Sequence, residues 1–290
     1  MNDTKTGTLR GSGVDLHFEV RGTGPLLLIS QSGEGDAGRS VDLVDHLVED
    51  HTVVTYDRRG LSRSRLADPE RGVTMAEHAD DVHRLLASLT DEPALMLGCS
   101  LGAVIGLHLA VRHPGQVSTL IAHEPVAPRL LPDAERIRHE RELRRVREIH
   151  RRDGLAPAVT EIARVLGIDP ENQETEPGLT RHPFTPERIA DFGFFIEHDF
   201  GAVVEDTLNP AEVRDTPTRV IPAAGRTTPR TVFDHRCARE LADLVGVALE
   251  EFPGGHNGNL THPRAYAARV RELLTPDTHR RTNQQSSTRT

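Results

Sequence analysis

The chain has 290 residues, two cysteines and a formal net charge of −9 at pH 7, so it can bury a full core as one large domain or as one domain with an insertion. The negative charge argues against a nucleic acid or an anionic membrane as the main partner, and two cysteines cannot form a disulfide framework. The sequence has neither the apolar core of a signal peptide nor the roughly 20 apolar residues that span a bilayer, so we expect a cytoplasmic protein that acts on a small molecule.

Strand and helix patterns alternate along most of the chain. Residues 14–20 alternate apolar and polar side chains as an edge strand does, and the apolar runs 26–29 and 53–56 suit buried parallel strands. Apolar residues at helical spacing follow over 75–89. Later strands and a closing helix are predicted at 93–97, 117–122, 218–222, 247–252 and 264–274. The alternation predicts an α/β fold with a mostly parallel central sheet and helices on both faces.

One stretch interrupts this alternation. Residues 128–213 are predicted to be helical and highly charged, and they contain most of the phenylalanines. We interpret them as a helical cap inserted into an α/β core made of residues 9–127 and 214–275. The two ends of the chain, 1–8 and 276–290, have little to bury and are predicted to be disordered tails.

The segment Gly98-Cys99-Ser100-Leu101-Gly102 has the G-x-S-x-G pattern of a nucleophile elbow, between a short apolar run and a predicted helix. Such an elbow turns sharply from strand to helix, and it holds its middle residue in a strained backbone conformation at the strand tip. Glycine on either side lacks the Cβ atom that would collide in this turn. We therefore predict that Ser100 is a nucleophile, and that Cys99 is packed and inert.

A serine hydroxyl needs a base that removes its proton, so the elbow predicts a catalytic histidine elsewhere. Among 16 histidines, His256 stands in the glycine-rich loop 253–258, after the last predicted strand and before the last helix. From there its ring can reach across the strand tips to Ser100, and we predict that it is the base. The alternative is a turn histidine without a catalytic role.

A carboxylate should orient the imidazole ring and stabilise its protonated form. Our candidate is Glu124, which ends the strand after the elbow and precedes a proline. The segment after strand 218–222, where many such folds keep this acid, has none before Asp234, and we expect Asp234 to sit on the next helix and to point elsewhere. Two alternatives stay open: Glu124 forms a structural ion pair, or a dyad is completed by water or by Asp206.

Two backbone N–H groups should stabilise the charge of a tetrahedral intermediate. One is that of Leu101, directly after the nucleophile, and we assign the other to Ser32 in the glycine-containing loop 30–35. In the same loop Gln31 is predicted to contact substrate through its side chain.

The phenylalanines of residues 128–213, together with His198, fit two interpretations equally well: they line a pocket, or they form a small core of the insertion. On the first interpretation, Phe195 and His198 contact substrate. The segment 56–64, which contains Asp-Arg-Arg-Gly, is interpreted as a turn that braces the sheet.

With these motifs the chain resembles α/β-hydrolase-fold proteins over residues 10–275. It is most similar to capped bacterial serine hydrolases in which Asp-Arg-Arg-Gly follows the fourth strand and His-Glu-Pro follows the sixth, here 57–60 and 123–125. The resemblance implies that Ser100 is the nucleophile and His256 the base.

The same resemblance implies that the amides of Leu101 and Ser32 are the oxyanion donors, although the family's usual His-Gly is absent from this loop. It places the acid on Glu124 only through the alternative position known in haloalkane-dehalogenase-like members. Those dehalogenases and the epoxide hydrolases are themselves excluded, because they carry an aspartate where Ser100 stands.

The leading hypothesis is a serine hydrolase that forms an acyl-enzyme on Ser100 from a small apolar ester, thioester or lactone. The alternative is a non-hydrolytic or C–C bond-acting enzyme on the same fold, such as a lyase, acyltransferase or cyclase of specialised metabolism, and a third hypothesis is a receptor that kept the pocket. No metal or cofactor is expected, since the sequence has no His-Glu-x-x-His spacing and no phosphate-binding glycine loop. Both a monomer and a homodimer remain open.

Overall fold

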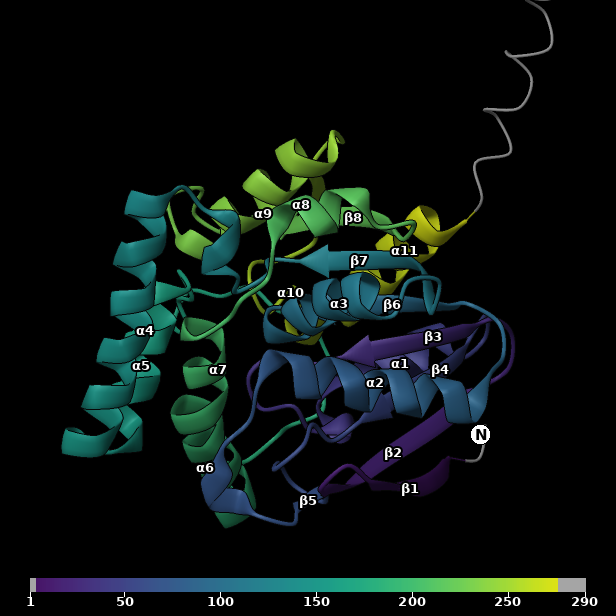
Figure 1. The fold of residues 1–290 in the computed structure, drawn as a ribbon, viewed down its shortest axis with the longest axis horizontal. Coiled ribbons are helices and arrows are strands. Elements are labelled where there is room, and N and C mark those ends of the chain that lie inside the picture. The colour runs from purple at the N-terminus through teal and green to yellow at the C-terminus, as the bar shows by residue number, and fades with distance from the viewer. Residues whose placement is uncertain (1–3, 276–290) are drawn as a thin grey trace, which may run out of the picture.

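A mixed sheet in the order β1-β2-β4-β3-β6-β7-β8-β9 is the middle layer of the fold (Figure 1). The structure is a computed structural model, and it describes residues 4–275. Its strands are β1 (Lys5–Gly11), β2 (Val14–Gly22), β3 (Leu26–Ser30), β4 (Thr52–Tyr56), β6 (Ala94–Cys99), β7 (Val117–His123), β8 (Arg219–Gly225) and β9 (Glu250–Phe252), and the short β5 (Arg65–Leu66) pairs with β2. β2 is antiparallel to β1 and β4, and all pairs from β4 to β9 are parallel. The predicted fold class is confirmed.

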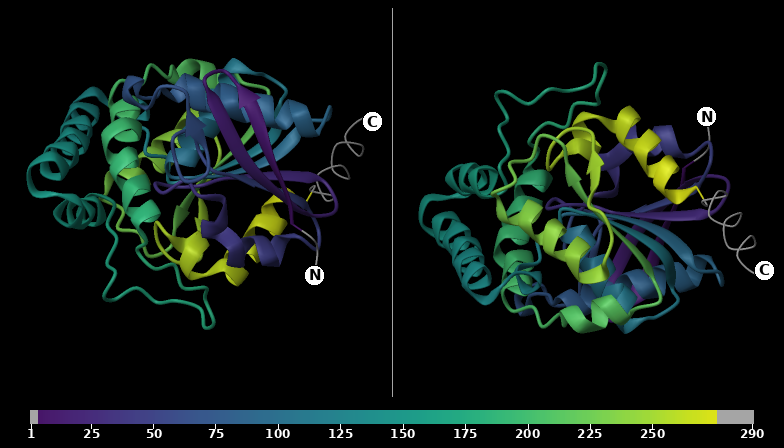
Figure 2. Two further views of the ribbon diagram at one scale, coloured as in Figure 1. Left: turned by 90° about the horizontal axis from the view of Figure 1, so that it is seen from below. Right: turned by 90° about the horizontal axis from the view of Figure 1, so that it is seen from above.

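Helices cover both faces of this sheet, as the two end views show (Figure 2). They are α1 (Val41–Leu47), α2 (Met75–Leu89), α3 (Leu101–Arg112), α8 (Pro210–Asp215), α9 (Phe233–Val245), α10 (Gly258–Thr261) and α11 (Pro263–Leu274). One hydrophobic cluster joins the sheet to α2, α3 and α9, and a second cluster joins its other face to α1 and α11. The crossover connections of a parallel sheet place helices on both faces in this way.

Local sequence explains the helix α2, which spans the predicted residues 75–89. Thr74 and Glu77 form a capping box at its start: each side chain accepts a hydrogen bond from the backbone N–H of the other residue. Its apolar stripe, including Val82 and Leu85, is fully buried against the sheet. Cap and stripe thus specify the same helix.

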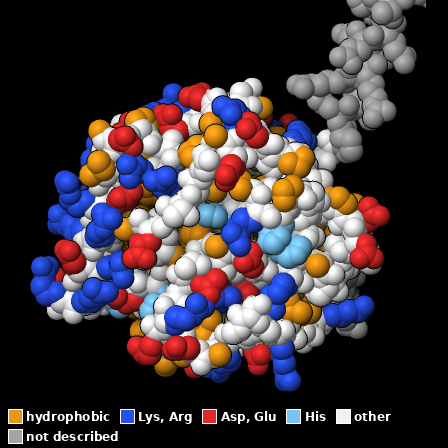
Figure 3. All heavy atoms as spheres, in the orientation of Figure 1, with side chains coloured by type: hydrophobic (Ala, Val, Ile, Leu, Met, Phe, Trp, Pro, Cys, Tyr) orange, Lys and Arg blue, Asp and Glu red, His pale blue; other side chains and the backbone are white. Residues whose placement is uncertain are grey.

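Beyond the carboxyl ends of the parallel strands lies a layer of helices (Figures 1 and 2). It consists of α4 (Asp133–Asp153), α5 (Leu155–Val165), α6 (Pro186–Phe194), a π-helical segment (Phe195–Asp199) and α7 (Phe200–Val204). Charged side chains cover its outer face (Figure 3), whereas Leu143, Val146 and Phe195 join the large cluster of the sheet. This layer therefore packs into the main core and has no separate core of its own within residues 4–275.

The predicted disorder of residues 1–8 is wrong where the chain forms β1. From Lys5 onward this strand pairs with β2, beginning at Lys5↔Val20. Its side chains are mostly exposed, so backbone hydrogen bonds to β2 hold it in place, and apolar periodicity gives no signal of it. Residues 1–3 and the predicted tail 276–290 lie outside the described residues.

Within residues 4–275, no helix combines the length and the apolar character needed to cross a bilayer.

Candidate active site

Ser100 lies at the turn between β6 and α3 in a strained conformation, with φ 55° and ψ −114°. Its backbone N–H donates a hydrogen bond to the His123 carbonyl oxygen at 2.8 Å. A Cβ atom on Gly98 would lie 2.6 Å from Ala103 Cα, and one on Gly102 would collide with the backbone of β3. Glycine is therefore required on both sides of the serine, as expected for a nucleophile elbow.

His256 follows β9 in a turn before α10, and its side chain is 2% exposed. Its Nδ1–H donates to Glu124 Oε2 at 2.7 Å. The loop around His256 lies close to the end of β8, since a Cβ atom on Gly225 would be 2.5 Å from the Gly255 carbonyl carbon. This close approach of two glycines brings the C-terminal loop over the strand tips.

Glu124 follows β7 and is itself in a left-handed conformation, with φ 44°. Its backbone N–H donates to the Ala223 carbonyl oxygen at 2.9 Å, and its Oε1 accepts a hydrogen bond from the Gly225 N–H at 2.8 Å. The carboxylate is thus within hydrogen-bond reach of the His256 ring, as the predicted triad requires. A non-glycine residue at positive φ costs free energy, and such strain is concentrated at functional sites.

The electrostatics of this pair favour an ionised glutamate. Burial alone would raise the pKa of Glu124, but the hydrogen bond from His256 and the nearby positive charge lower it to about 2. Burial alone would likewise lower the pKa of His256, but Asp234, when ionised, and Glu124 raise it above its usual range. An anion beside Nδ1 also fixes the tautomer that leaves Nε2 free to accept a proton.

Asp234 lies on α9, as expected, but its carboxylate does not point elsewhere. Its Oδ2 is 2.6 Å from His256 Nδ1, and the side chain is fully buried. The expectation failed because the direction of a side chain in the first turn of a helix depends on how that helix packs, which spacing does not reveal. In the sequence, the position of Asp234 as the first acidic residue after β8 was the signal that could have indicated this contact with His256.

Glu124, Asp234 and His256 each offer one atom that could bind a metal ion, and these atoms lie within 4.8 Å of one another. His256 Nδ1 carries the proton that Glu124 accepts, so it has no lone pair to offer a cation. We therefore interpret these three side chains as a hydrogen-bond cluster and not as a metal site.

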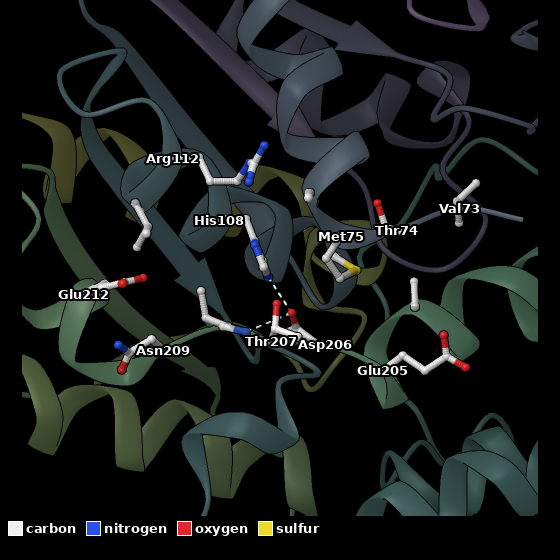
Figure 4. A pocket seen from close by; sticks show the side chains of 14 residues that line it. Val73, Thr74, Met75, His108, Arg112, Glu205, Asp206, Thr207, Asn209 and Glu212 are labelled. Atoms are coloured by element: carbon white, nitrogen blue, oxygen red, sulfur yellow. Dashed lines mark hydrogen bonds and ion pairs between the residues drawn. The ribbon is translucent and has the colours of Figure 1, made fainter.

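Asp206, the other alternative acid, does not approach His256. It accepts a hydrogen bond from His108 Nε2 at 2.7 Å, in a separate cavity between α3 and the segment that leaves α7 (Figure 4). A dyad completed by Asp206 is therefore excluded.

Ser100 and His256 line one cavity of about 290 Å³, and a larger cavity of about 660 Å³ meets it at His256. No hydrogen bond links the two side chains in the described structure; such contacts are often long without substrate. Most of the wall of the smaller cavity is apolar and is contributed by Val159, Ile162, Ala163, Leu166, Ile168, Phe184, Phe192, Phe195 and Leu260. Three phenylalanines thus line the cavity, as the first interpretation predicts. The second interpretation is corrected, because Phe195 and Phe200 join the main core and not a separate core of the insertion.

One end of the smaller cavity is polar and joins the helical layer to the loop after β3. Glu34 from this loop accepts hydrogen bonds from Arg188 of α6 at 2.6 and 2.8 Å, and Arg39 lies 3.0 Å from the same carboxylate. The Arg188 guanidinium also stacks over the Phe184 ring, 4.2 Å from its centroid. A bidentate ion pair of this kind holds α6 at the rim of the cavity.

Ser32 lies on the cavity wall, as predicted for an oxyanion donor. The carbonyl oxygens of Gln31 and Ser32 accept hydrogen bonds from Arg58 at 3.4 and 3.0 Å. Because a trans peptide directs its N–H opposite to its C=O, the Ser32 N–H points away from Arg58. The Leu101 N–H belongs to the first turn of α3, where amides have no acceptor within the helix.

Arg58 forms a buried network that sequence analysis interpreted only as a brace. Its guanidinium donates to Asp199 Oδ2 at 2.7 Å, and His78 Nε2 lies 3.0 Å from Asp199 Oδ1. Asp199 belongs to the π-helical segment, so this ion pair connects the helical layer to the loop that carries Ser32. Burial would raise the pKa of Asp199, but Arg58 and His78 lower it below its usual value. The Asp-Arg-Arg-Gly motif was the one signal of this role.

Two predicted substrate contacts do not lie on the wall of this cavity. The Gln31 side chain is buried away from it and accepts a hydrogen bond from the Ser40 hydroxyl at 2.7 Å. His198 packs against the Phe194 ring at a centroid distance of 4.4 Å. The π-helical turn directs Phe195 into the cavity and His198 away from it, so Phe195 lines this cavity, whereas Gln31 and His198 do not.

Comparisons with known proteins identify the fold family. A family model described as the alpha/beta hydrolase fold matches residues 25–167. The uncharacterized hydrolase YraK of Bacillus subtilis is 34% identical over 272 residues, which cover 92% of this chain and 95% of that protein.

Two solved structures are similar in fold. The enol-lactonase from Burkholderia xenovorans LB400 has a TM-score of 0.68 at 19% identity, with 93% of this chain and 100% of that chain covered. Est816, an N-acyl homoserine lactone degrading enzyme, has a TM-score of 0.68 at 20% identity, with 92% and 100% covered.

Proposed function

The chain belongs to the alpha/beta hydrolase fold family, and from this premise we propose that it is a serine hydrolase that cleaves a small apolar ester, thioester or lactone. The observation that carries the proposal is the buried hydrogen bond between His256 and Glu124, at a cavity that Ser100 also lines. A nucleophile, a base and an orienting acid are the side chains that acyl transfer requires.

In the proposed reaction, Ser100 Oγ attacks the carbonyl carbon while His256 Nε2 accepts the hydroxyl proton. The proton on Nδ1 stays there and remains hydrogen-bonded to Glu124, whose charge stabilises the imidazolium ion. The bond to the leaving group then breaks, and the leaving group takes the proton from Nε2, so that an acyl group remains on Ser100. A water molecule, deprotonated by His256 Nε2, attacks this ester. The bond to Ser100 Oγ then breaks, Oγ takes the proton from Nε2, and the acid is released.

The oxyanion of each intermediate would be held by the amides of Leu101 and Ser32. Both belong to backbone that other contacts already fix: the start of α3 for Leu101, and the Arg58-bound loop for Ser32. Donors held in place before reaction stabilise developing charge without a cost of reorganisation, and loss of one donor typically lowers kcat by about 10²–10³-fold.

The substrate class follows from the cavity. Its volume of about 290 Å³ suits a small molecule, and its mostly apolar wall suits an apolar acyl group. We propose that residues 128–213 act as a cap, since α5, α6 and the π-helical segment supply much of this wall. The names of the two similar structures, an enol-lactonase and a lactone-degrading enzyme, support lactones as substrates to be tested first.

A fluorophosphonate probe tests the nucleophile directly. We expect the purified chain to gain one phosphonyl group, which peptide mass spectrometry locates on Ser100. We also expect hydrolysis of short p-nitrophenyl esters and of simple lactones, and loss of both labelling and hydrolysis in Ser100→Ala.

Two outcomes would contradict the proposal. If the folded chain does not react with the probe, Ser100 is not an activated nucleophile. If it is labelled but turns over no short ester, thioester or lactone, the non-hydrolytic alternative on the same fold gains support.

A further inference from the structure

Two carboxylates share one nitrogen in the cluster around His256. Glu124 Oε2 lies 2.7 Å and Asp234 Oδ2 lies 2.6 Å from Nδ1, and both acidic side chains are completely buried. Nδ1 carries at most one proton, so it can donate a full hydrogen bond to only one of them. The other acid needs a different explanation.

The hydrogen bonds distinguish the two acids. Glu124 accepts from the His256 ring and from the Gly225 N–H, so its charge has two donors. Neither oxygen of Asp234 has a hydrogen-bond donor in the described structure, and its short contact with Nδ1 lies off the N–H direction. A buried, ionised carboxylate without donors beside a second anion is strongly unfavourable.

We propose that Asp234 is a positioning residue that carries a proton in the active enzyme, so that Glu124 is the single negative charge facing His256. The two carboxyl groups have oxygens within 4.8 Å of each other, and the Asp234 O–H would donate to the Glu124 carboxylate. This inference rests on the proposed role of His256 as the base.

The groups around this carboxyl supply no second cation that would stabilise its charge. His123 on β7 is neutral at physiological pH, because burial lowers its pKa to about 4, and burial also lowers the pKa of His235 on α9. The Cys237 thiol donates to a backbone carbonyl oxygen at 3.3 Å, and burial raises its pKa. Within residues 4–275, the charged groups that act on this carboxyl are His256 and Glu124. Burial raises the pKa of this aspartate and the His256 charge lowers it, but burial together with the Glu124 charge outweighs His256, and the pKa is about 7.

A protonated Asp234 would also be able to replace Glu124 as the acid that orients His256. If Glu124 becomes neutral, the repulsion that keeps the proton on Asp234 disappears, and Asp234 can ionise at 2.6 Å from Nδ1. It would then orient the ring in place of Glu124. The two acids follow neighbouring strands, β7 and β8, so both reach the same histidine.

Infrared spectroscopy of the folded chain tests the protonation state without requiring catalysis. At pH 6 we expect a carbonyl band of a protonated carboxyl group that Asp234→Asn removes. Asp206→Asn, which changes another buried aspartate that contacts a histidine, should leave this band in place. If the band is unchanged in Asp234→Asn, Asp234 is ionised and the inference is wrong, whether or not the chain is a serine hydrolase.

Heat stability gives a second readout with a defined sign. A folded-state pKa above the unfolded value makes the stability contribution of Asp234 largest below pH 4, and this contribution is lost as the pH rises toward 7. Asp234→Asn should therefore raise Tm relative to the unmodified chain at pH 8 and have a smaller effect at pH 5. A lower Tm of Asp234→Asn at pH 8 would indicate an ionised partner of His256.

Kinetics test the positioning role. At pH 6, Asp234→Asn should lower kcat by no more than about 10-fold. It should also leave the part of the rising limb of kcat/KM below pH 7 in place, since below that pH a neutral group replaces a neutral group. Glu124→Gln should lower kcat by about 10–10²-fold, and the double variant by about 10⁴-fold. A shift of the limb by one pH unit in Asp234→Asn, or equal losses in Glu124→Gln and the double variant, would overturn the proposal.

Discussion

Two buried histidine–carboxylate pairs of this fold are similar in their contacts and different in their surroundings. His256 donates to Glu124 at 2.7 Å, and His108 lies 2.7 Å from Asp206. The first pair shares its cavity with Ser100 at the strained turn after β6, while the second lines a cavity between α3 and the exit from α7 (Figure 4). A buried, short contact between a histidine and a carboxylate therefore does not by itself identify an active site. What distinguishes His256 is a cavity shared with Ser100, the proposed nucleophile at the strand tip, and a second acid at Nδ1.

The largest expected effect separates the two histidines. His256→Gln should lower kcat for a short ester by about 10⁴–10⁶-fold, because no other group is placed to accept the Ser100 proton. His108→Gln should change kcat by less than about 3-fold. Steady-state kinetics of both purified variants, with circular dichroism as a control for folding, measure the difference. Similar losses in the two variants would contradict the assignment of the base.

An intermediate effect is expected where the helical layer meets the loop 30–35, which carries Ser32 and is called the oxyanion loop below. Asp199→Asn removes the charge that faces Arg58, which also binds the carbonyl oxygens of Gln31 and Ser32. We expect kcat to fall by about 10–10²-fold, through a displaced Ser32 amide, with a smaller change in KM.

The matched control for this variant is His78→Gln, which changes the other partner of Asp199 and leaves the Arg58 ion pair intact. We expect it to retain most of the activity. Asp199 would be a purely structural residue if its asparagine variant lost Tm but kept the kcat of the unmodified chain.

The smallest effect on catalysis is expected at Asp206. Asp206→Asn weakens the hydrogen bonds from His108 and from the Leu208 N–H, so the free energy of unfolding should fall by about 1–3 kcal/mol. Urea unfolding measures this loss, and ester hydrolysis at a temperature where the variant is folded should be unchanged within about 2-fold. A large loss of kcat in the folded variant would mean that the second cavity contributes to activity.

Sequence-based prediction succeeded for features that local interactions specify and failed for features that depend on residues far apart in the chain. The elbow could be located because its constraint is local: a strand, two glycines and a helix within a few residues dictate where Ser100 must lie. The capping box and apolar stripe of α2 are also local. The edge strand β1 was missed because its partner β2 contributes backbone groups, which leave no pattern in side-chain type.

Within the site, His256 and Glu124 could be proposed from sequence because each directly follows a strand whose carboxyl end must meet the others at one edge of the sheet. The roles of Asp234 and Asp199 could not. Their side chains approach His256 and Arg58 through the packing of α9 and of the π-helical segment. The same packing decided that Phe195 faces the cavity and His198 does not.

The amino-acid sequence alone thus determined the fold class, the strained serine and the histidine loop, because short-range steric rules and strand order specify them. Only the tertiary structure decided how many carboxylates the histidine faces, what holds the oxyanion loop and which side chains enclose the cavity. These features depend on contacts between residues far apart in the chain, such as Glu124 with His256, 132 positions apart, or Arg58 with Asp199, 141 positions apart. Such contacts exist only after the helices have packed.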